Sequence, residues 1–465
     1  MTRTRCSIAP WAMGLTAAAL AAAVYAVPSV YPTGTTIYDP DRAWNGFTVF
    51  IAPEDTGAIV VDMNGNTVKH WSGYHGGGGG PARILPGGHV LAAGPMRPPH
   101  QESNVLIQMD FDGNVVWQFD RTEQVETPDG ETIWSARQHH DWQREGMHAG
   151  YYSPEDGTVV DGGKTLVVTH VNHTLPNVSP NVLEDDRIIE VSADGEILWD
   201  WNAGDHVDEL GLSDRARELL LEPRDIGDTT RGFDWLHINS ATYLGPNRWY
   251  DAGDERFHPD NVIISARYAN LTAIIARDGS IAWRLGPDYS ETEAGSAIGQ
   301  VHGQHNPHII PKGLPGGGNL LVFDNGSNAG WGSNNVRGAV GLGNIVRPNS
   351  RVLEIDPVAL EVVWSYSMAG RESFKFYSHY ISNAQRLQNG NTLIIEGADG
   401  RLFEVTTDGE IIWEYVSPYF AEREAPSNAV YRAYRVPYDW IPQLDRPVER
   451  RVVPPDLSEF RIAPQ

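Results

Sequence analysis

The sequence predicts an all-β protein, a six-bladed β-propeller of four-stranded antiparallel blades. Three observations support this. A hairpin signature ending in tryptophan recurs six times along the 465 residues, and a second, more variable hairpin often precedes it. The 48 Gly and 31 Pro are spread along the chain, which indicates many turns rather than disorder. Two hairpins make a four-stranded sheet, and repetition of such sheets is typical of a propeller.

Each copy of the signature has an apolar strand, a turn and a second apolar strand that ends in Trp. Five turns contain Asp-Gly or Asn-Gly, where glycine adopts a positive φ without steric cost. The fifth copy has Pro-Val-Ala-Leu-Glu instead, which predicts a looser hairpin. The copies span residues 57–71, 104–117, 187–199, 270–283, 351–364 and 401–413.

The preceding hairpin is clearest at residues 82–94, 307–326 and 384–397. Intervals between the signature tryptophans range from 46 to 84 residues, too irregular for a solenoid. Propeller loops tolerate insertions of this kind. We expect the six tryptophans to pack between neighbouring blades, because a large aromatic side chain on an outer strand suits that role.

The two ends of the chain predict a targeting segment and a tail. Residues 1–26 combine an arginine-containing start with an uncharged, alanine-rich stretch and Val24-Tyr25-Ala26, typical of a cleaved signal peptide. We therefore expect export to the periplasm, with an uncleaved membrane anchor as the alternative. The propeller is expected over residues 33–440, and residues 441–465 form an extended, poorly packed strap rich in Pro and charge.

Two further segments carry structural expectations. Residues 205–224 form the one stretch with a helical pattern, which Ser213 can cap and Pro223 can stop. Residues 429–440 alternate apolar and polar side chains. We expect them to return to the first blade and close the ring.

Composition excludes several classes of partner and chemistry. The net charge of −25 disfavours nucleic acid and anionic membrane surfaces, and an anionic substrate would need local Arg or His. The sole cysteine, Cys6, lies in the targeting segment. The mature chain therefore offers no disulfide, thiolate metal ligand or catalytic thiol.

Three histidines stand at comparable points of successive units. His237, His305 and His379 each precede the first apolar anchor of a unit by five to eight residues. In a propeller these starts meet at one end of the central channel. His148 opens the third unit in a similar way.

The chemistry of this histidine cluster stays open at this point. A histidine in such a place is often a hydrogen-bonded structural residue. The run HGQHNPH (302–308) holds three His in seven residues, which Zn²⁺ or Mn²⁺ would also select. A metal-dependent lyase or hydrolase on a propeller and a non-enzymatic binding propeller are therefore alternatives to a metal-free enzyme.

Several motifs resemble the bacterial arylsulfate sulfotransferase family, exported enzymes that use no nucleotide sulfate donor. The resemblance covers nearly the whole mature chain. Its motifs are IYDPDRAWNGFTVF (37–50), DWLHINS (234–240), GQHNPHI (303–309), LLVFDNG (320–326), SHYISNAQRLQNGNTLI (378–394) and VYRAYRVPYDW (430–440).

The resemblance implies a ping-pong reaction that needs no cofactor. His379 takes a sulfuryl group from a phenolic sulfate ester and passes it to a phenol acceptor, with His237 and His305 in support. The family arginine after DNG matches Arg337, with Arg347 and Arg351 as rivals. We expect four further residues to bind substrate: His148, Asn239, Asn306 and Asn325. The sequence leaves the oligomeric state open, and a homodimer is compatible with it.

Physical chemistry agrees with these roles. Sulfuryl transfer, like phosphoryl transfer, needs in-line positioning and neutralisation of peripheral oxygens, which suits an arginine fork. An attacking histidine must be neutral, and its ordinary pKa of about 6.5 favours that. A phenolate leaving group has a conjugate-acid pKa of about 10, so a general acid speeds its departure by about 10²- to 10⁴-fold.

Overall fold

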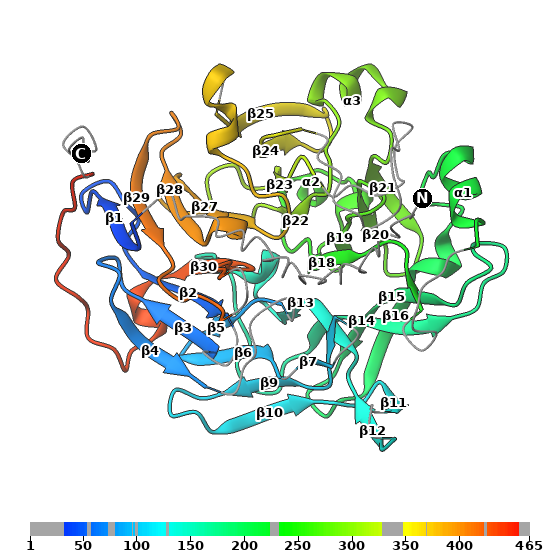
Figure 1. Cartoon of the computed structure of the whole chain (residues 1–465), viewed down its shortest axis with the longest axis horizontal. Coiled ribbons are helices and arrows are strands. Elements are labelled where there is room, and N and C mark those ends of the chain that lie inside the picture. The colour runs from blue at the N-terminus through cyan, green and yellow to red at the C-terminus, as the bar shows by residue number, and fades with distance from the viewer. Residues whose placement is uncertain are drawn as a thin grey trace, which may run out of the picture.

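The structure is a computed structural model that describes residues 32–53, 57–72, 80–94, 96–97, 101–126, 130–223, 232–327, 347–368, 370–422 and 426–454. It confirms the predicted fold, because six antiparallel sheets stand around one central axis (Figure 1). Residues 1–26, the expected signal peptide, lie outside the described residues.

Each blade has four strands that follow one another from the axis outward. Blade 1 contains β30 (Ala433–Val436), β2 (Phe47–Ala52), β3 (Gly57–Val61) and β4 (Thr67–Trp71). Blade 2 contains β5 (Arg83–Leu85), β6 (His89–Ala93), β9 (Leu106–Met109) and β10 (Val115–Phe119). Blade 3 contains β13 (Gln138–Arg144), β14 (Thr165–His173), β15 (Leu183–Val191) and β16 (Ile197–Asn202).

The remaining blades follow the same order. Blade 4 contains β18 (Ile238–Tyr243), β19 (Val262–Ala266), β20 (Leu271–Ile275) and β21 (Ile281–Leu285). Blade 5 contains β22 (His305–Ile309), β23 (Leu320–Asp324), β24 (Arg351–Asp356) and β25 (Glu361–Tyr366). Blade 6 contains β26 (Asn383–Arg386), β27 (Thr392–Glu396), β28 (Arg401–Val405) and β29 (Ile411–Val416). All six predicted Trp-ended hairpins therefore form the outer two strands of a blade.

Shorter elements decorate the ring. The additional strands are β1 (Gly34–Tyr38), β7 (Met96–Arg97), β8 (Glu102–Ser103), β11 (Glu123–Glu126), β12 (Thr132–Ser135) and β17 (Phe233–Asp234). The 3₁₀ turns span His148–Gly150, Ala203–His206, Glu255–Phe257, Tyr289–Glu291, Gly370–Lys375, Gly397–Asp399 and Tyr438–Trp440. The α-helices are α1 (Asp214–Leu220), α2 (Arg248–Asp251) and α3 (Glu293–Ile298).

The helical expectation is confirmed only in part. The Ser213 side chain caps α1 by accepting from the Ala216 amide, as predicted, but the helix covers seven residues rather than the whole of 205–224. Helices α2 and α3 were not predicted, since four and six residues are too short for a periodic pattern. None of the described helices is long and apolar enough to cross a membrane.

Both ends of the chain close the ring. Strand β30 pairs antiparallel with β2, which confirms the predicted return of residues 429–440. At the other end β1 adds a fifth strand to the outer edge of blade 6 by pairing with β29, which the sequence did not predict. Because of these two pairings, the first and last blades cannot separate without breaking the hydrogen bonds between strands of a sheet.

The C-terminal strap is extended but not loose. Over residues 441–454 its backbone follows the outer edge of the first and last blades (Figure 1). Val452 forms two backbone hydrogen bonds with Tyr38 of β1, each 2.9 Å long. The Arg450 amide donates to the Asn64 side chain at 3.0 Å. These hydrogen bonds tie the strap to the ring, while most of its side chains, such as Val448 and Val453, stay exposed.

The six signature tryptophans link the blades, as expected. Each indole N–H donates to a backbone carbonyl in the outer-hairpin turn of the next blade, so the six bonds run once around the ring. The pairs are Trp71–Asp110 (2.8 Å), Trp117–Ala193 (2.8 Å), Trp199–Arg277 (3.0 Å), Trp283–Pro357 (3.0 Å), Trp364–Thr407 (2.8 Å) and Trp413–Met63 (2.9 Å).

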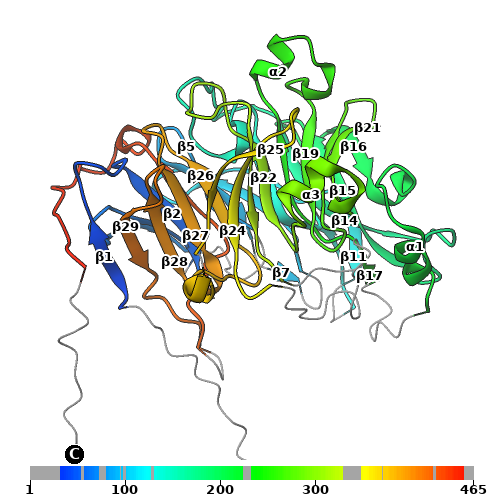
Figure 2. The same ribbon diagram turned by 90° about the horizontal axis from the view of Figure 1, so that it is seen from above.

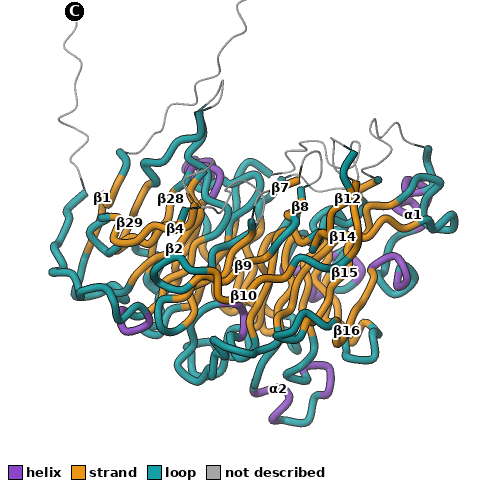
Figure 3. Tube along the Cα trace, turned by 90° about the horizontal axis from the view of Figure 1, so that it is seen from below, coloured by secondary structure: helices purple, strands orange, loops and turns teal. Residues whose placement is uncertain are grey.

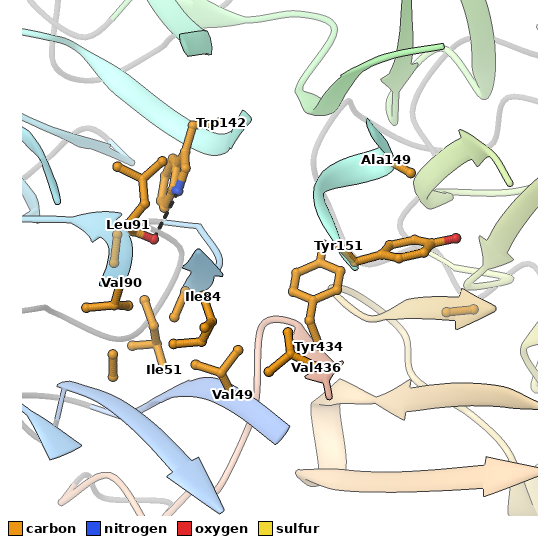
Figure 4. Close-up of a cluster of buried hydrophobic side chains, with 14 of the residues drawn as sticks. Val49, Ile51, Ile84, Val90, Leu91, Trp142, Ala149, Tyr151, Tyr434 and Val436 are labelled. Carbon is orange, nitrogen blue, oxygen red and sulfur yellow. Dashed lines mark hydrogen bonds between the residues drawn. The ribbon is translucent and has the colours of Figure 1, made fainter. Parts of the chain in front are cut away.

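Apolar side chains fill the space between neighbouring blades. Figure 4 shows Val49 and Ile51 of β2 facing Ile84 of β5 and Val90 of β6, all buried. Trp142 of β13 closes the same cluster and donates its indole N–H to the Leu91 carbonyl at 3.4 Å. The alternating side chains of each blade thus enter two inter-blade cores.

The two faces of the ring differ. Strands form the middle layer and loops cover both sides (Figure 3). Helix α2, which follows the end of β18, projects from one side, and β7 and β17 lie toward the other (Figure 2). Strand β17 precedes β18, so the side with β17 is where the inner strands begin. We call this side the histidine face.

The tryptophan ring predicts a stability effect. Trp413 is fully buried, and Trp413→Phe would keep most of its apolar packing while leaving the Met63 carbonyl without its donor. We expect a loss of about 1–3 kcal/mol in the free energy of unfolding, measured by urea titration. Trp134→Phe, at a position with 47% exposure on β12, is the control and should change little. Equal effects of the two substitutions would contradict the assignment.

Candidate active site

A left-handed residue marks the start of each inner strand from blade 3 to blade 6. His140, His237 and Asn306 have φ angles of 56°, 55° and 50°. The strand register shifts around His140 and Asn306, and in β18 it shifts just after His237, between Ile238 and Ser240. In blade 6, Ile381 and Ser382 have φ angles of 52° and 92°. Such a conformation costs a non-glycine residue about 1–3 kcal/mol and is held only where its surroundings fix it. These bulges turn the adjacent side chains toward the channel.

The blade 3 histidine at this position is His140, not His148. The inner strand of blade 3 covers Gln138–Arg144, so His148 follows it instead of preceding it. The Nδ1 atom of His148 is 2.7 Å from Asp156 Oδ1, and its ring lies beside Gly245, beyond the end of β18. The expectation that His148 joins the other histidines is wrong, because it lies at the opposite end of the inner strands.

His140 and His237 meet across two blades. Their ring centroids are 4.6 Å apart in an edge-to-face arrangement. The Nδ1 atom of His237 lies 2.6 Å from Asp234 Oδ2. A carboxylate on Nδ1 keeps a proton there and stabilises the imidazolium when Nε2 is also protonated. The Asp234–His237 pair can therefore serve as a general acid and base.

His305 is held as a neutral imidazole. Its Nδ1 lies 2.7 Å from Asn325 Oδ1 and 3.1 Å from the Gly303 carbonyl, both acceptors, so the proton is on Nδ1. Burial, and next the charge of Arg267, lower the pKa of His305 well below its ordinary value. The Nε2 atom of His305 therefore offers a lone pair.

Asn325 ties His305 to the loop that carries His379. Its side-chain N–H groups donate to the carbonyls of Ser378 (2.8 Å) and Ile381 (2.9 Å). The amide, predicted to bind substrate, is fully buried and bonded at both ends. Asn325 therefore positions two histidines.

His379 is the most accessible of the three predicted histidines. It is exposed, whereas His237 and His305 are 6% and 2% exposed. Its ring lies near Tyr380, with centroids 4.5 Å apart. Partial enclosure of the ring, and next the charge of Arg267, lower the pKa of His379. A neutral imidazole facing solvent is what a nucleophile for an incoming ester requires.

Arg267 is a site residue that the sequence did not reveal. It follows β19 of blade 4 and is 8% exposed, and its backbone N–H donates to the His237 carbonyl at 3.3 Å. Within the described part of the chain its guanidinium forms no hydrogen bond or ion pair, only a cation–π contact with Tyr268 at 5.6 Å. The turn RYAN carries no motif, so only the fold reveals this arginine.

The three arginines predicted from the sequence differ in what the structure shows of them. Arg337 lies outside the described residues, so its role stays a prediction. Arg347 and Arg351 both pair with the buried carboxylate of Asp324, at 2.7 Å and 2.6 Å. The one carboxylate balances only one of the two positive charges, but both guanidiniums are held in ion pairs.

Asn239 and Asn306 have different environments. The Asn239 side chain donates to the Gln304 carbonyl at 2.8 Å and so joins the inner strands of blades 4 and 5. Asn306, next to His305, is 1% exposed, and neither side-chain polar atom has a hydrogen-bond partner among the described residues. Asn306 therefore retains hydrogen-bonding capacity for a ligand.

A buried ion network fills the channel behind the histidines. Asp141 accepts from Arg83 and, at 3.0 Å, from Arg432. Arg432 also donates to the Asn239 carbonyl at 2.5 Å. These charged side chains are fully buried and come from blades 2 and 3 and the segment before β30. This network supports the histidine face from within the channel.

Two buried groups have the spacing of metal ligands. They are His139, His170 and Asp186, and Glu102, His170 and Glu184, all in or beside blade 3. Neither group contains His302, His305 or His308, which were the sequence candidates for a metal site. Among the described residues, the side chains spaced to bind a metal ion therefore lie in or beside blade 3 and not in blade 5.

Fold and site together define a class of protein: a six-bladed β-propeller that holds imidazoles from blades 3 to 6 and a buried arginine at one face. Residues 101–418, more than half of the chain, match the Arylsulfotransferase (ASST) family. The chain belongs to this family. Membership supports aryl sulfotransferase activity in general, with small aryl molecules as substrates.

Solved structures resemble the chain distantly. A Bacteroides caccae protein of unknown function is 10% identical, covering 84% of this chain and 99% of its own, with a TM-score of 0.41. A streptogramin B lyase is 13% identical over 84% of both chains (TM-score 0.35), and a periplasmic gluconolactonase of Pseudomonas aeruginosa is 12% identical over 84% and 99% (TM-score 0.34). No curated protein matches the chain. Likenesses at this level carry no functional argument.

The buried histidines predict acid sensitivity. Burial lowers the pKa of His308 to about 4, whereas an unfolded histidine has a pKa of about 6.5. Between these values the unfolded chain binds a proton that the folded chain excludes, so stability falls as the pH falls. As the pH falls from 6 to 5, the free energy of unfolding should fall in both proteins. We expect the fall to be smaller in His308→Gln than in the wild type, by about 1 kcal/mol per pH unit. The half-exposed His258→Gln is the control, and parallel curves for wild type and His308→Gln would refute the prediction.

Proposed function

We propose that the chain is an arylsulfate sulfotransferase that moves a sulfuryl group from a phenolic sulfate ester to a phenol through a sulfohistidine. The observation that carries the proposal is an accessible neutral imidazole, His379, that senses the charge of Arg267, whose guanidinium has no hydrogen-bond partner among the described residues. Family membership supplies the reaction class. No cofactor is needed for either half of the reaction.

In the first half-reaction an imidazole nitrogen of His379 attacks sulfur. The N–S bond forms and the bond from sulfur to the phenolic oxygen breaks. Arg267 neutralises the peripheral sulfuryl oxygens, and the proton held on His237 goes to the leaving phenolate. The contact of Asp234 with Nδ1 fixes the ring of His237 for this transfer.

The second half-reaction runs in the opposite sense. The acceptor phenol gives its proton to His237 while its oxygen attacks sulfur, and the N–S bond breaks. His305 stays neutral throughout, because burial and Arg267 hold its pKa low. Its Nε2 lone pair and the amide of Asn306, which has no hydrogen-bond partner within the described part of the chain, are suited to orient the acceptor or donor.

We also propose that the protein works after export. The arginine-containing start and the apolar stretch of residues 1–26 support a cleaved signal peptide and a periplasmic location.

Turnover of 4-nitrophenyl sulfate with and without added phenol tests the function. We expect nitrophenol release that depends on the phenol and falls by at least about 10³-fold in His379→Ala, because the nucleophile is lost. His258→Ala, on a surface loop, should keep wild-type turnover. Without phenol, mass spectrometry should find one sulfuryl group on the peptide that contains His379. Full activity in His379→Ala would refute the nucleophile, and turnover of no aryl sulfate would refute the function.

Arg267→Gln tests the charge at the site. We expect kcat/KM to fall by about 10²- to 10³-fold, because a preorganised donor to the transition state is removed. The acid limb of the pH profile should move to higher pH, because the positive charge that lowers the pKa of His379 is gone. Arg256→Gln, at the surface, is the control. If Arg267→Gln keeps both rate and profile while Arg337→Gln loses activity, the sulfuryl-binding role belongs to Arg337.

A further inference from the structure

Three hydrogen-bond acceptors converge in the interior of blade 3. His139 of β13, His170 of β14 and Asp186 of β15 come from neighbouring strands and are 0%, 4% and 0% exposed. Asp186 Oδ1 lies 3.4 Å from His139 Nε2 and 3.9 Å from His170 Nε2. The two imidazoles stack with centroids 3.6 Å apart, so their Nε2 atoms face the same carboxylate oxygen.

The surrounding contacts show which atoms hold protons. His170 Nδ1 lies 3.2 Å from Glu102 Oε2, so this nitrogen donates and leaves Nε2 as the atom of His170 that can bind an ion. Asp186 Oδ2 accepts from the Ile238 amide at 3.0 Å. His139 Nε2 and Asp186 Oδ1 have no hydrogen-bond partner within the described part of the chain. Acceptors left facing one another in a dry interior cost free energy, because nothing replaces the water they lose.

Protons fit this arrangement poorly. A proton shared by His139 Nε2 and Asp186 Oδ1 would span 3.4 Å, at the long limit of a hydrogen bond. A proton on His170 Nε2 would face Asp186 Oδ1 across 3.9 Å, beyond hydrogen-bonding distance, and would leave His139 Nε2 without a partner. Atoms that share one Zn²⁺ at about 2.1 Å lie roughly 3.0–3.6 Å apart. The 3.4 Å between His139 Nε2 and Asp186 Oδ1 lies within this range. His170 Nε2, at 3.9 Å from the same oxygen, needs to move by only a few tenths of an ångström.

Local charge also favours a cation. The carboxylates of Glu102, Glu184 and Asp186 lie around His170. Arg137, with its Nε 3.1 Å from Glu102 Oε2, is the arginine that pairs with this group. One divalent ion would balance the remaining negative charge, which is costly to bury unpaired.

We propose that His139 Nε2, His170 Nε2 and Asp186 Oδ1 bind one divalent transition-metal ion, Zn²⁺ or Mn²⁺. Two imidazoles and one carboxylate suit these borderline ions, whereas Ca²⁺ and Mg²⁺ prefer oxygen ligands alone. The proposal does not depend on the reaction at the neighbouring histidines. It differs from the sequence-based metal alternative, which used the histidines of blade 5.

The ion acts on the histidine face through one hydrogen bond. His139 Nδ1 lies 2.7 Å from His140 Nδ1, so one proton is shared between them. With metal on His139 Nε2, that proton belongs to His139 Nδ1, and the neutral His140 carries its own proton on Nε2. His140 packs edge-on against His237. The metal is therefore a positioning element for the imidazole pair.

Metal content and thermal unfolding of the full chain test the site. We expect about one equivalent of Zn or Mn per chain by elemental analysis. After removal by a chelator, added Zn²⁺ or Mn²⁺ should raise Tm by about 3–5 °C at a hundredfold excess over Kd, whereas Ca²⁺ and Mg²⁺ should not. Only trace transition metal together with no Tm shift would overturn the proposal, and so would a response to Ca²⁺ or Mg²⁺ alone.

Two variants assign the ligands. Asp186→Asn preserves shape and should lose the bound metal and the Tm response, while Asp200→Asn, at the surface of the same blade, should keep both. Metal retained in Asp186→Asn would refute the ligand set. If Asp186→Asn fails to fold, chelation and metal titration of the wild type still decide whether the protein binds the ion. These readouts are independent of sulfuryl transfer, and His379→Ala should leave them unchanged.

Discussion

The ring of tryptophan hydrogen bonds is the interaction on which the rest of the structure depends. Each indole N–H reaches the outer turn of the next blade, and the last bond, Trp413 to Met63, joins blade 6 to blade 1. The chain has a single cysteine, so no disulfide can form within it. The blades are therefore held by six repeated polar contacts, by the apolar cores between them, and by β30 and β1, which close the ring from both ends of the chain.

Inside this ring the innermost strands have little further strand pairing, since among them β13 pairs with the short β8 at Gln138, and side chains bond backbone groups at the open edges. Asn239 bonds the next blade, and Asn383 exchanges two hydrogen bonds with Ala433. The Arg83–Asp141–Arg432 network fills the remaining space. Strain in the left-handed residues is tolerated because this framework is rigid, and it turns imidazoles toward one face.

The histidines at that face differ because their partners differ. Asp234 contacts Nδ1 of His237, Asn325 fixes a neutral His305, and His379 is exposed and near enough to Arg267 to sense its charge. One residue type thus supplies an acid–base group, a fixed acceptor and a candidate nucleophile. Blade 3 adds a fourth environment, in which the pairing of His139 with His140 connects the buried carboxylates to the same face.

The sequence by itself determined the repeat, the blade number, the closing strand at 429–440 and the blades to which His237, His305 and His379 belong, because these depend on local strand patterns and their order. It could not show that His148 follows its strand, since the boundaries of the inner strand of blade 3 depend on pairing with β14. Nor could it find Arg267, His140 or the ligands of blade 3. These residues lie in unrelated local contexts, and only the tertiary structure brings them together around the channel.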